Sequence, residues 1–266
     1  MTIPYLEVLA GIAMALSILM AGAWLVQQRT GNSGWVDTIW TFSVGLVGAG
    51  SALWSVAGAS PNARQWLVAC LVAIWSLRLG AHIAIRTAGI TDDPRYAAFA
   101  REWGVDSPRR MFIFLQNQGL GSVPPALSIF VAAHLPGDAL RLQDYLGALI
   151  LLAGIAGEAL ADAQLKRFRD NPANKDRVCD IGLWRWSRHP NYFFEWFGWL
   201  AYPMIALSPN YGWGLATLLA PVFMYWILVY ETGIPPLEAQ MLRSRGDRYR
   251  DYQSRTSPFF PWLPQA

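Results

Sequence analysis

The chain has 266 residues, of which 54% are hydrophobic and only 15% are charged, a composition too apolar for an ordinary soluble domain. The net charge of +3 is small enough to follow from membrane topology alone, and it does not call for a nucleic-acid partner. Cys70 and Cys179 lie in a predicted span and a predicted loop, so we expect no disulfide. Sequence patterns typical of zinc sites, Rossmann domains and Walker loops do not occur, and no metal is predicted.

Long apolar stretches predict an integral membrane protein of the all-α class. Each stretch has about 20 residues and few charges, which is enough to cross a bilayer. The first stretch lacks a basic leader and a small-residue cleavage site, so it predicts a retained span and not a signal peptide. Residues 1–266 are therefore expected to form a single transmembrane domain with seven spans, at 5–26, 35–57, 64–85, 111–134, 144–164, 191–208 and 211–230.

The basic residues predict the orientation of these spans. All but three of the 21 Lys and Arg residues (the exceptions are Arg64, Arg78 and Arg141) fall in alternate connections and in the C-terminal tail. Since cytosolic segments are enriched in Lys and Arg, we expect the N-terminus outside and the C-terminus in the cytosol.

Polar residues in the second and third predicted spans gather toward the cytosolic end. Asp37 and Trp40 share one helix face, either as part of an interfacial tryptophan belt or as the wall of a polar cavity. Arg78, His82 and Arg86 are spaced by four and form a single stripe. Arg78 is expected about 10 Å inside the span, where an arginine needs an acidic partner or an anionic ligand.

The fourth predicted span is interrupted by the amides at 116–118 and by Pro124-Pro125. Freed backbone groups and amides at this depth are tolerated where they line a cavity, although a kinked packing helix is an alternative. The fifth span ends with Glu158 and Asp162 on one face, and Arg169 returns to that face two turns later. Two like charges at this spacing repel each other unless something neutralises them.

The stretch 182–199 joins a basic loop to an apolar helix. Ser187 is expected to cap this helix, and Pro190 fits its first turn. Asn191 and Glu195 then share one face, with Tyr192 beside them. A carboxylate one turn inside an apolar segment is costly unless it is paired or faces a polar cavity. Further on, residues 239–252 predict one basic amphipathic helix at the membrane surface.

Because these ionisable residues cluster at the cytosolic ends, we expect one polar cavity open to the cytosol. Carboxylates, amides and arginines in its wall suit a cofactor that carries phosphate or adenosine, and the apolar interior is left for a lipophilic substrate.

Several segments resemble the bacterial branch of the steroid 5α-reductase family. They are Arg188-His-Pro-Asn-Tyr192 with Glu195, Asp92-Asp-Pro-Arg-Tyr96, Glu231-Thr232, and the tail from Arg245 to Trp262. The resemblance implies a seven-helix fold that binds NADPH from the cytosolic side and reduces the Δ4 double bond of 3-ketosteroids or a related enone. It also implies a multi-pass protein of the bacterial inner membrane, and we expect a monomer surrounded by lipids.

By motif, the resemblance assigns cofactor contacts to Asp162, Arg169, Arg177, Asn191 and Glu195, with Arg188, His189 and Tyr192 as neighbours. Glu158 stands where animal enzymes have Asn, and Glu238 and Tyr249 complete the expected cofactor set. In the animal enzymes a helix-2 Glu and a helix-3 Tyr serve the substrate carbonyl. Here Asp37 is the acidic candidate, with His82 or Arg78 in place of the missing Tyr, and we include Glu195 among the residues expected to support the reaction.

Two alternatives remain open. The Arg-His-Pro motif followed by Tyr, and a C-terminal Glu, are shared with isoprenylcysteine carboxyl methyltransferases that use S-adenosylmethionine. The arginines between 162 and 177 suit the phosphates of NADPH better than they suit an adenosyl cation. A seven-helix receptor or retinal protein is the second alternative, but a retinal Schiff base needs a lysine within a span, and Lys166 and Lys175 lie outside the spans or at a helix end.

Overall fold

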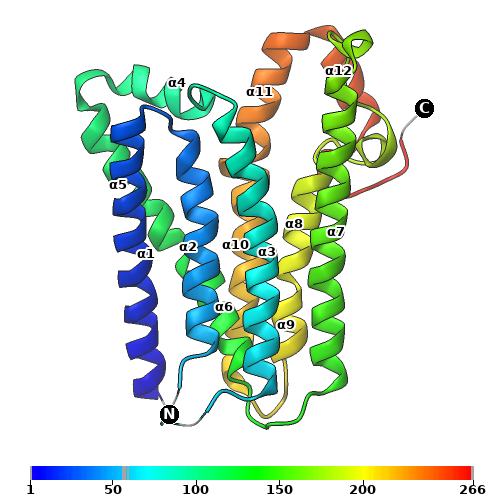
Figure 1. The fold of residues 1–266 in the computed structure, drawn as a ribbon. Coiled ribbons are helices and arrows are strands. Elements are labelled where there is room, and N and C mark those ends of the chain that lie inside the picture. The colour runs from blue at the N-terminus through cyan, green and yellow to red at the C-terminus, as the bar shows by residue number, and fades with distance from the viewer. Residues whose placement is uncertain (1, 56–57, 59, 265–266) are drawn as a thin grey trace. The chain divides into compact units, whose positions relative to one another are not determined.

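A computed structural model describes residues 2–55, 58 and 60–264 of the chain. The described residues form helices and no strand (Figure 1), which confirms the all-α prediction for this part of the chain. Among these described residues, four helices are long and apolar enough to cross a membrane, at Tyr5–Thr30, Ala63–Ala88, Leu142–Asp170 and Gly212–Arg245. They coincide with the first, third, fifth and seventh predicted spans.

The other three predicted spans fall on shorter or interrupted helices. The second coincides with α2 (Gly34–Ala52), and its last residues, 56–57, lie outside the described residues. The fourth is divided into α5 (Ser107–Gly121) and α6 (Val123–Ala133). The sixth is divided into α8 (Pro190–Trp199) and α9 (Ala201–Ala206). The count of seven spans and their orientation therefore stay predictions.

The remaining elements complete the chain. The long helices are α1 (Thr2–Thr30), α3 (Ala63–Ala88) and α7 (Leu142–Asp170), and α4 (Pro94–Trp103) is short. Short 3₁₀ turns occur at Gly104–Asp106, Pro172–Asn174 and Gly182–Arg185. The last predicted span begins as a 3₁₀ segment (Gly212–Leu218), continues as α10 (Leu219–Trp226) and ends in a π-helical turn (Ile227–Glu231).

The prediction of one continuous amphipathic helix over 239–252 is wrong. The structure has α11 (Ile234–Arg245) and α12 (Asp247–Arg255), separated by Gly246. Gly246 has a φ of +55°, a conformation that residues with a Cβ seldom adopt, so the helical path ends there. The tyrosines of α12, Tyr249 and Tyr252, are buried within the protein.

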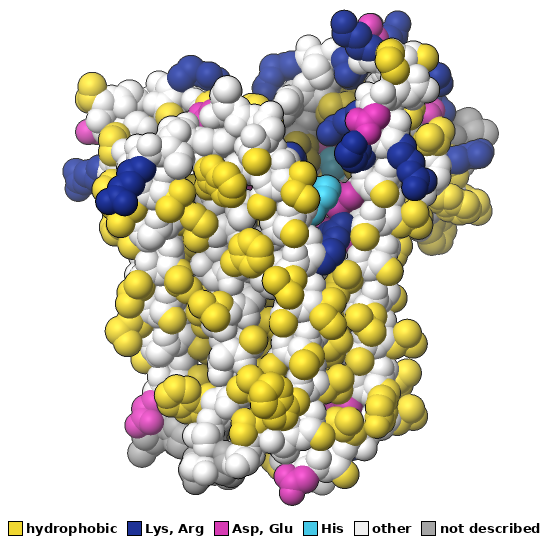
Figure 2. Space-filling model, viewed as in Figure 1, with side chains coloured by type: hydrophobic (Ala, Val, Ile, Leu, Met, Phe, Trp, Pro, Cys, Tyr) yellow, Lys and Arg dark blue, Asp and Glu magenta, His cyan; other side chains and the backbone are white. Residues whose placement is uncertain are grey.

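The chain forms two compact units. Unit 1 comprises Met1–Ala148 and Tyr202–Ala220, and unit 2 comprises Leu149–Ala201 and Pro221–Ala266. On the face seen in Figure 2, hydrophobic side chains cover the sides of the helices in each unit, whereas Lys and Arg side chains gather toward one end. This distribution matches helices whose sides meet an apolar environment.

Within unit 1, glycines bring α2 and α3 into close contact. A Cβ added at Gly45 would lie only 2.1 Å from Ser76 Oγ, and one at Gly34 would lie 2.9 Å from Thr87 Oγ1. The Ser76 hydroxyl donates to the carbonyl of Thr41 across the same contact. This α3-facing stripe of α2 leaves Asp37 and Trp40 on another face of the helix, which contacts α4 and the α5–α6 junction.

A fully buried ion pair joins the first turns of α3 and α7 in unit 1. Arg64 Nε lies 3.0 Å from Asp144 Oδ1, and both side chains have 0% exposure. The same guanidinium donates to the carbonyls of Leu135, Gly137 and Ala139. Because Arg64 begins α3 and Asp144 begins α7, the pair ties these two helices and the α6–α7 loop together. The sequence placed both residues only at the outer ends of spans.

Within unit 2, two glycines bring α7 against α8. A Cβ at Gly154 would lie 2.8 Å from the carbonyl oxygen of Phe194 and 2.9 Å from Gly198 Cα. A Cβ at Gly157 would lie 2.3 Å from the Phe194 ring. Since the atoms at Gly154 belong to the backbone, no larger side chain fits unless the helices separate. The close contact sets which polar residues of the two helices meet, among them Asp162 of α7 and Asn191 at the start of α8.

Candidate functional site

The polar residues predicted on α7 and α8 meet where these helices continue beyond their glycine contact. Asn191 Nδ2 donates to Asp162 Oδ1 at 3.4 Å. The loop before α8 is held on α7 as well, because Trp184 Nε1 donates to the carbonyl of Ala161 and Leu183 N donates to Gln164 Oε1, both at 2.9 Å. The structure thus brings Asp162 and Asn191 together, as their predicted common role requires.

Two predicted carboxylates are buried on the same pair of helices. Glu158 is 5% exposed and Glu195 is 8% exposed. Trp199 Nε1, one turn along α8, donates to Glu195 Oε1 at 2.9 Å. Asn191 and Glu195 lie in one continuous helix, which confirms their predicted i, i+4 spacing. Buried carboxylates are costly in an apolar helix pair, so this part of unit 2 is a strong candidate for a polar ligand site.

Glu238 of α11 gathers several of the other predicted cofactor residues around itself. Arg188 Nε donates to Glu238 Oε1 at 2.7 Å, His189 Nε2 lies 3.2 Å from the same oxygen, and Gln253 Nε2 donates to Oε2 at 2.8 Å. Tyr249 lies beside Glu238 and Arg188, and burial, followed by the charge of Glu238, raises its pKa. The family resemblance placed Arg188, His189, Glu238 and Tyr249 around the cofactor, whereas the structure shows them interacting with one another.

Arg188 has most of its donors engaged. Its Nη1 donates to the carbonyls of Gln253 and Thr256 at 3.1 and 2.5 Å, and its backbone N–H donates to the carbonyl of Ser257 at 2.8 Å. The side chain is 9% exposed. Arg188 therefore fastens the C-terminal residues to the start of α8. A guanidinium bonded in this way has little capacity left for a phosphate.

The prediction that Ser187 caps α8 is wrong. The residue that caps this helix is His189, and its side chain makes no capping hydrogen bond. Ser187 Oγ instead accepts from the N–H of His189 and donates to the carbonyl of Phe259. The hydroxyl is used because the C-terminal residues pass over the loop. Sequence spacing could not reveal this tertiary contact.

His189 is buried at the start of α8 with its ring stacked on that of Tyr192, at 5.7 Å between centroids. Burial lowers the pKa of His189 below its ordinary value, although the hydrogen bond and charge of Glu238 act in the opposite direction. The neutral imidazole is thus favoured in the folded protein. The rings of His189 and Tyr192 therefore contact each other at the start of α8.

The predicted phosphate-binding arginines lie at the exposed end of unit 2. Arg169 is in the last turn of α7, and Arg177 follows in the loop, with its Nη1 3.4 Å from Asn174 Oδ1. Arg177 also lines a cavity of about 330 Å³ together with Arg248 and Arg255. The latter two were not singled out by the sequence analysis. The basic residues of the tail could have indicated Arg248 and Arg255, but we interpreted that pattern as a helix at the membrane surface.

In unit 1, Asp37 lies in a cluster with residues of α4. Arg95 Nη2 donates to Asp37 Oδ2 at 2.5 Å, and the Tyr96 hydroxyl donates to Asp37 Oδ1 at 2.8 Å. Burial and the charge of Asp37 raise the pKa of Tyr96. Both oxygens of Asp37 therefore accept hydrogen bonds from residues of α4. The sequence named Tyr96 as part of a motif but missed its contact with Asp37.

Asp93 connects this cluster with the arginine stripe of α3. Its side chain caps α4 by accepting from the N–H of Arg95, and it also accepts from the guanidinium of Arg95. Burial by itself would raise the pKa of Asp93, but the bonds from Arg95 outweigh burial and lower it. Arg86 reaches Asp93 at 3.8 Å. Arg78 and His82 lie on the same continuous helix α3, so their predicted spacing is confirmed.

The interrupted span contributes to the Asp37 cluster and to helix packing. Gln118 Nε2 donates to the Tyr96 hydroxyl at 3.3 Å, and Trp40 Nε1 donates to Ser122 Oγ at 2.6 Å, where α5 ends. Gln116 instead bonds to Ser17 of α1 at 2.5 Å. Gln118 thus joins the Asp37 cluster, whereas Gln116 packs α5 against α1.

Among the residues that the structure describes, no group of three or more His, Cys, Asp or Glu side chains is placed to hold a metal ion. Cys70 and Cys179 are both free. For Cys179, which lies in the loop after α7, burial raises the thiol pKa, so it is not poised as a nucleophile.

Long apolar helices that end in clustered polar residues are typical of integral membrane proteins. The model of one protein family, described as a protein of unknown function (DUF1295), matches residues 23–256. The chain belongs to this family. No curated protein and no solved structure matches it.

Proposed function

We propose that this protein is an NADPH-dependent membrane reductase, and that it reduces the Δ4 double bond of a 3-ketosteroid or of a related lipophilic enone. The observation that carries the proposal is the polar set on α7 and α8, in which Asp162 bonds to Asn191 and Glu195 is buried one turn further along. Membership of a family whose sequences resemble membrane steroid reductases supports it. We further propose seven spans in the inner membrane, with the N-terminus outside.

The residues of unit 2 have the chemistry that NADPH requires. Carboxylate and amide oxygens of Asp162, Asn191 and Glu195 can accept from ribose hydroxyls and a carboxamide. Arg169 and Arg177, at the end of α7 and in the loop after it, can meet phosphates. Because Arg188, His189 and Glu238 bond to one another, we assign them to support of the loop that leads into α8.

When bound, NADPH supplies the hydride, and the protein must stabilise the negative charge that develops on the enone oxygen. A hydrogen-bond donor is needed at that oxygen. The Tyr96 hydroxyl gives its only proton to Asp37, so in this cluster we propose Asp37 as the group that serves the enone oxygen. His82 and Arg78 on α3 are the other candidate donors.

The first test is purification in mild detergent, followed by the near-ultraviolet absorbance of added NADPH with and without testosterone or progesterone. We expect binding and steroid-dependent oxidation. Binding of S-adenosylmethionine in place of NADPH would refute the reductase and favour the methyltransferase. Binding of NADPH without oxidation would refute 3-ketosteroids as substrates.

Two variants test the cofactor site directly. Glu195→Gln keeps an oxygen acceptor for Trp199, so it should fold, yet it removes the charge; we expect NADPH affinity to fall by about tenfold to a hundredfold. Arg177→Ala should weaken NADPH binding without changing the steroid requirement. Lys175→Ala, in the same exposed loop, is the control and should have little effect. Equal effects of the two loop variants would contradict a phosphate contact at Arg177.

A further inference from the structure

The residues after α12 form a fixed strap over the loop that precedes α8. We define this C-terminal strap as residues 257–263. The N–H of Arg188 donates to the carbonyl of Ser257, and Ser187 Oγ donates to that of Phe259, both at 2.8 Å. The N–H of Trp262 donates to the carbonyl of Trp186 at 2.9 Å. Three hydrogen bonds along seven residues make the strap an ordered part of unit 2.

The inner side of the strap is packed against aromatic residues of α8 and α10. Phe259 is 3% exposed, and its ring centroid lies 5.8 Å from that of Trp196 and 5.3 Å from that of Tyr225. Phe260 contacts the same two rings. Because α8 and α10 are apolar helices, this packing holds the strap against apolar side chains of unit 2.

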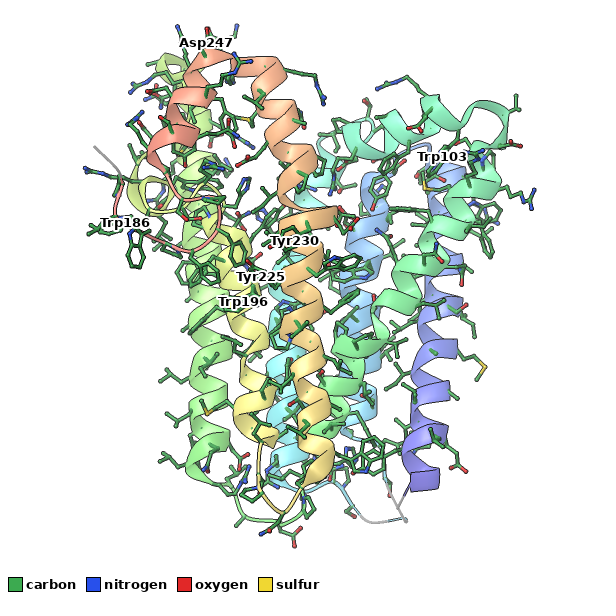
Figure 3. All side chains as sticks on the ribbon, turned by 180° about the vertical axis from the view of Figure 1, so that it is seen from behind. Trp103, Trp186, Trp196, Tyr225, Tyr230 and Asp247 are labelled. Carbon is green, nitrogen blue, oxygen red and sulfur yellow. The ribbon has the colours of Figure 1, made fainter. Side chains whose placement is uncertain are left out.

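The outer side of the strap carries large apolar side chains that are mostly exposed. Trp262 is 71% exposed, Leu263 is 67% exposed, and Trp186, which bonds to the strap, is 42% exposed. Figure 3 shows Trp186 pointing away from the helices of unit 2, whereas Trp196 and Tyr225 lie among them. Exposed tryptophans at the end of apolar helices are typical of the boundary between lipid and water.

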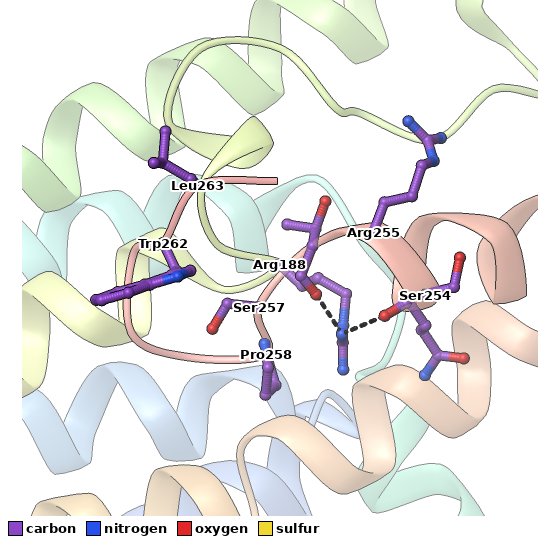
Figure 4. A pocket seen from close by; sticks show the side chains of 9 residues that line it. Arg188, Ser254, Arg255, Ser257, Pro258, Trp262 and Leu263 are labelled. Carbon is purple, nitrogen blue, oxygen red and sulfur yellow. Dashed lines mark hydrogen bonds between the residues drawn. The ribbon is translucent and has the colours of Figure 1, made fainter. Parts of the chain in front are cut away.

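Trp262 and Leu263 line a cavity of about 390 Å³. Figure 4 shows its wall, with Trp262, Leu263 and Pro258 on one side and Arg255 and Ser254 on the other. Its volume falls within the range of about 300–1,000 Å³ that is usual for small-molecule sites. Arg188 also lines the cavity, but its bonds to Glu238 and to backbone carbonyls leave Arg255 as the main source of positive charge.

We propose that this cavity binds an anionic phospholipid, with the phosphate at Arg255 and the acyl chains along Trp262 and Leu263. The wall matches such a molecule because it joins one cationic edge to one apolar edge, and the apolar edge is formed by the exposed side chains of Trp262 and Leu263. Arg255 is 44% exposed and bonds to Asp251 at the surface, so its remaining donors can reach a phosphate. A soluble anion would make no use of the apolar edge.

The test is native mass spectrometry of the purified full-length protein with added phosphatidylglycerol or phosphatidylcholine. We expect phosphatidylglycerol to remain bound more tightly. Arg255→Gln should weaken it about fivefold, the factor that corresponds to about 1 kcal/mol for one arginine near an anionic lipid surface. Trp262→Ser should weaken both lipids, by about tenfold, because it removes an apolar contact worth about 1.5 kcal/mol or more.

Matched variants serve as controls. Arg250→Gln removes another exposed arginine of α12, which pairs with Asp247 and does not line the cavity. Trp66→Ser removes an exposed tryptophan of unit 1. Neither should change lipid retention. An equal loss in the control and test variants would overturn the proposal, and so would displacement of phosphatidylglycerol by inorganic phosphate, or a second copy of the chain bound in place of lipid.

Discussion

Replacing Glu238 by Gln is expected to destabilise unit 2 even when no cofactor is present. The substitution keeps the length of the side chain but removes the charge that faces Arg188, whose side chain is 9% exposed. It also weakens the contacts with His189 and Gln253. Arg188 would keep its bonds to backbone carbonyls and a neutral amide acceptor, but it would be a largely buried cation without its anionic partner.

The size of the effect follows from these contacts. Breaking a buried ion pair by removing one partner costs about 3–5 kcal/mol, and a hydrogen bond to a charged group is worth about 1.5–3 kcal/mol. Glu238 is 15% exposed, and the carbonyl acceptors of Arg188 remain. We therefore expect a loss of about 2–3 kcal/mol, within the range for a hydrogen bond to a charged group and below the range for a fully broken ion pair.

The assay is equilibrium unfolding in mixed micelles without NADPH. Asp251→Asn is the matched control, because Asp251 pairs with Arg255 at 2.8 Å but both side chains are well exposed, at 66% and 44%. Exposed pairs contribute less than about 1 kcal/mol. If Glu238→Gln cost no more than the control, and lowered only NADPH affinity, Glu238 would be a cofactor ligand and our assignment of a supporting role would be refuted.

Three further outcomes are expected. Arg64→Met should cost about 3–5 kcal/mol in the same unfolding assay, because it leaves the fully buried carboxylate of Asp144 without its main partner; a loss below about 1 kcal/mol would contradict this. Gly154→Ala should cost about 1–3 kcal/mol through overpacking against the backbone of α8, whereas Gly22→Ala, with no atom within 4 Å of the added Cβ, should not destabilise. The free energy of unfolding should fall as the pH drops below about 6.5. The pKa of His189 is lowered in the folded state, so the unfolded state takes up the proton first. His189→Gln should flatten this slope between about pH 7.5 and pH 5.5, and an unchanged slope would exclude His189 as its source.

Sequence patterns determined the elements whose cause is local. Long apolar stretches predicted the four helices that can cross a membrane, because helix length and lack of charge are properties of the stretch itself. The spacing of Asn191 and Glu195, and that of Arg78 and His82, was likewise predicted, since helical periodicity alone sets which residues share a face.

Local signals also had limits within the chain. The tail from 239 to 252 has helical periodicity throughout, yet Gly246 adopts a positive φ and divides it into α11 and α12. The capping role expected of Ser187 failed for a different reason. Its hydroxyl is engaged by Phe259, which is more than 70 residues away in the chain.

Only the tertiary structure decided which polar residues bond to one another. Asp37 is held by Arg95 and Tyr96, and Arg188 is held by Glu238, across separations of about 50 residues or more. A sequence of charges does not specify these pairs, because several cations could reach each carboxylate until packing fixes the helices. The glycine contacts between α2 and α3, and between α7 and α8, set that packing by excluding every larger side chain. They thereby help to determine which polar residues of neighbouring helices meet.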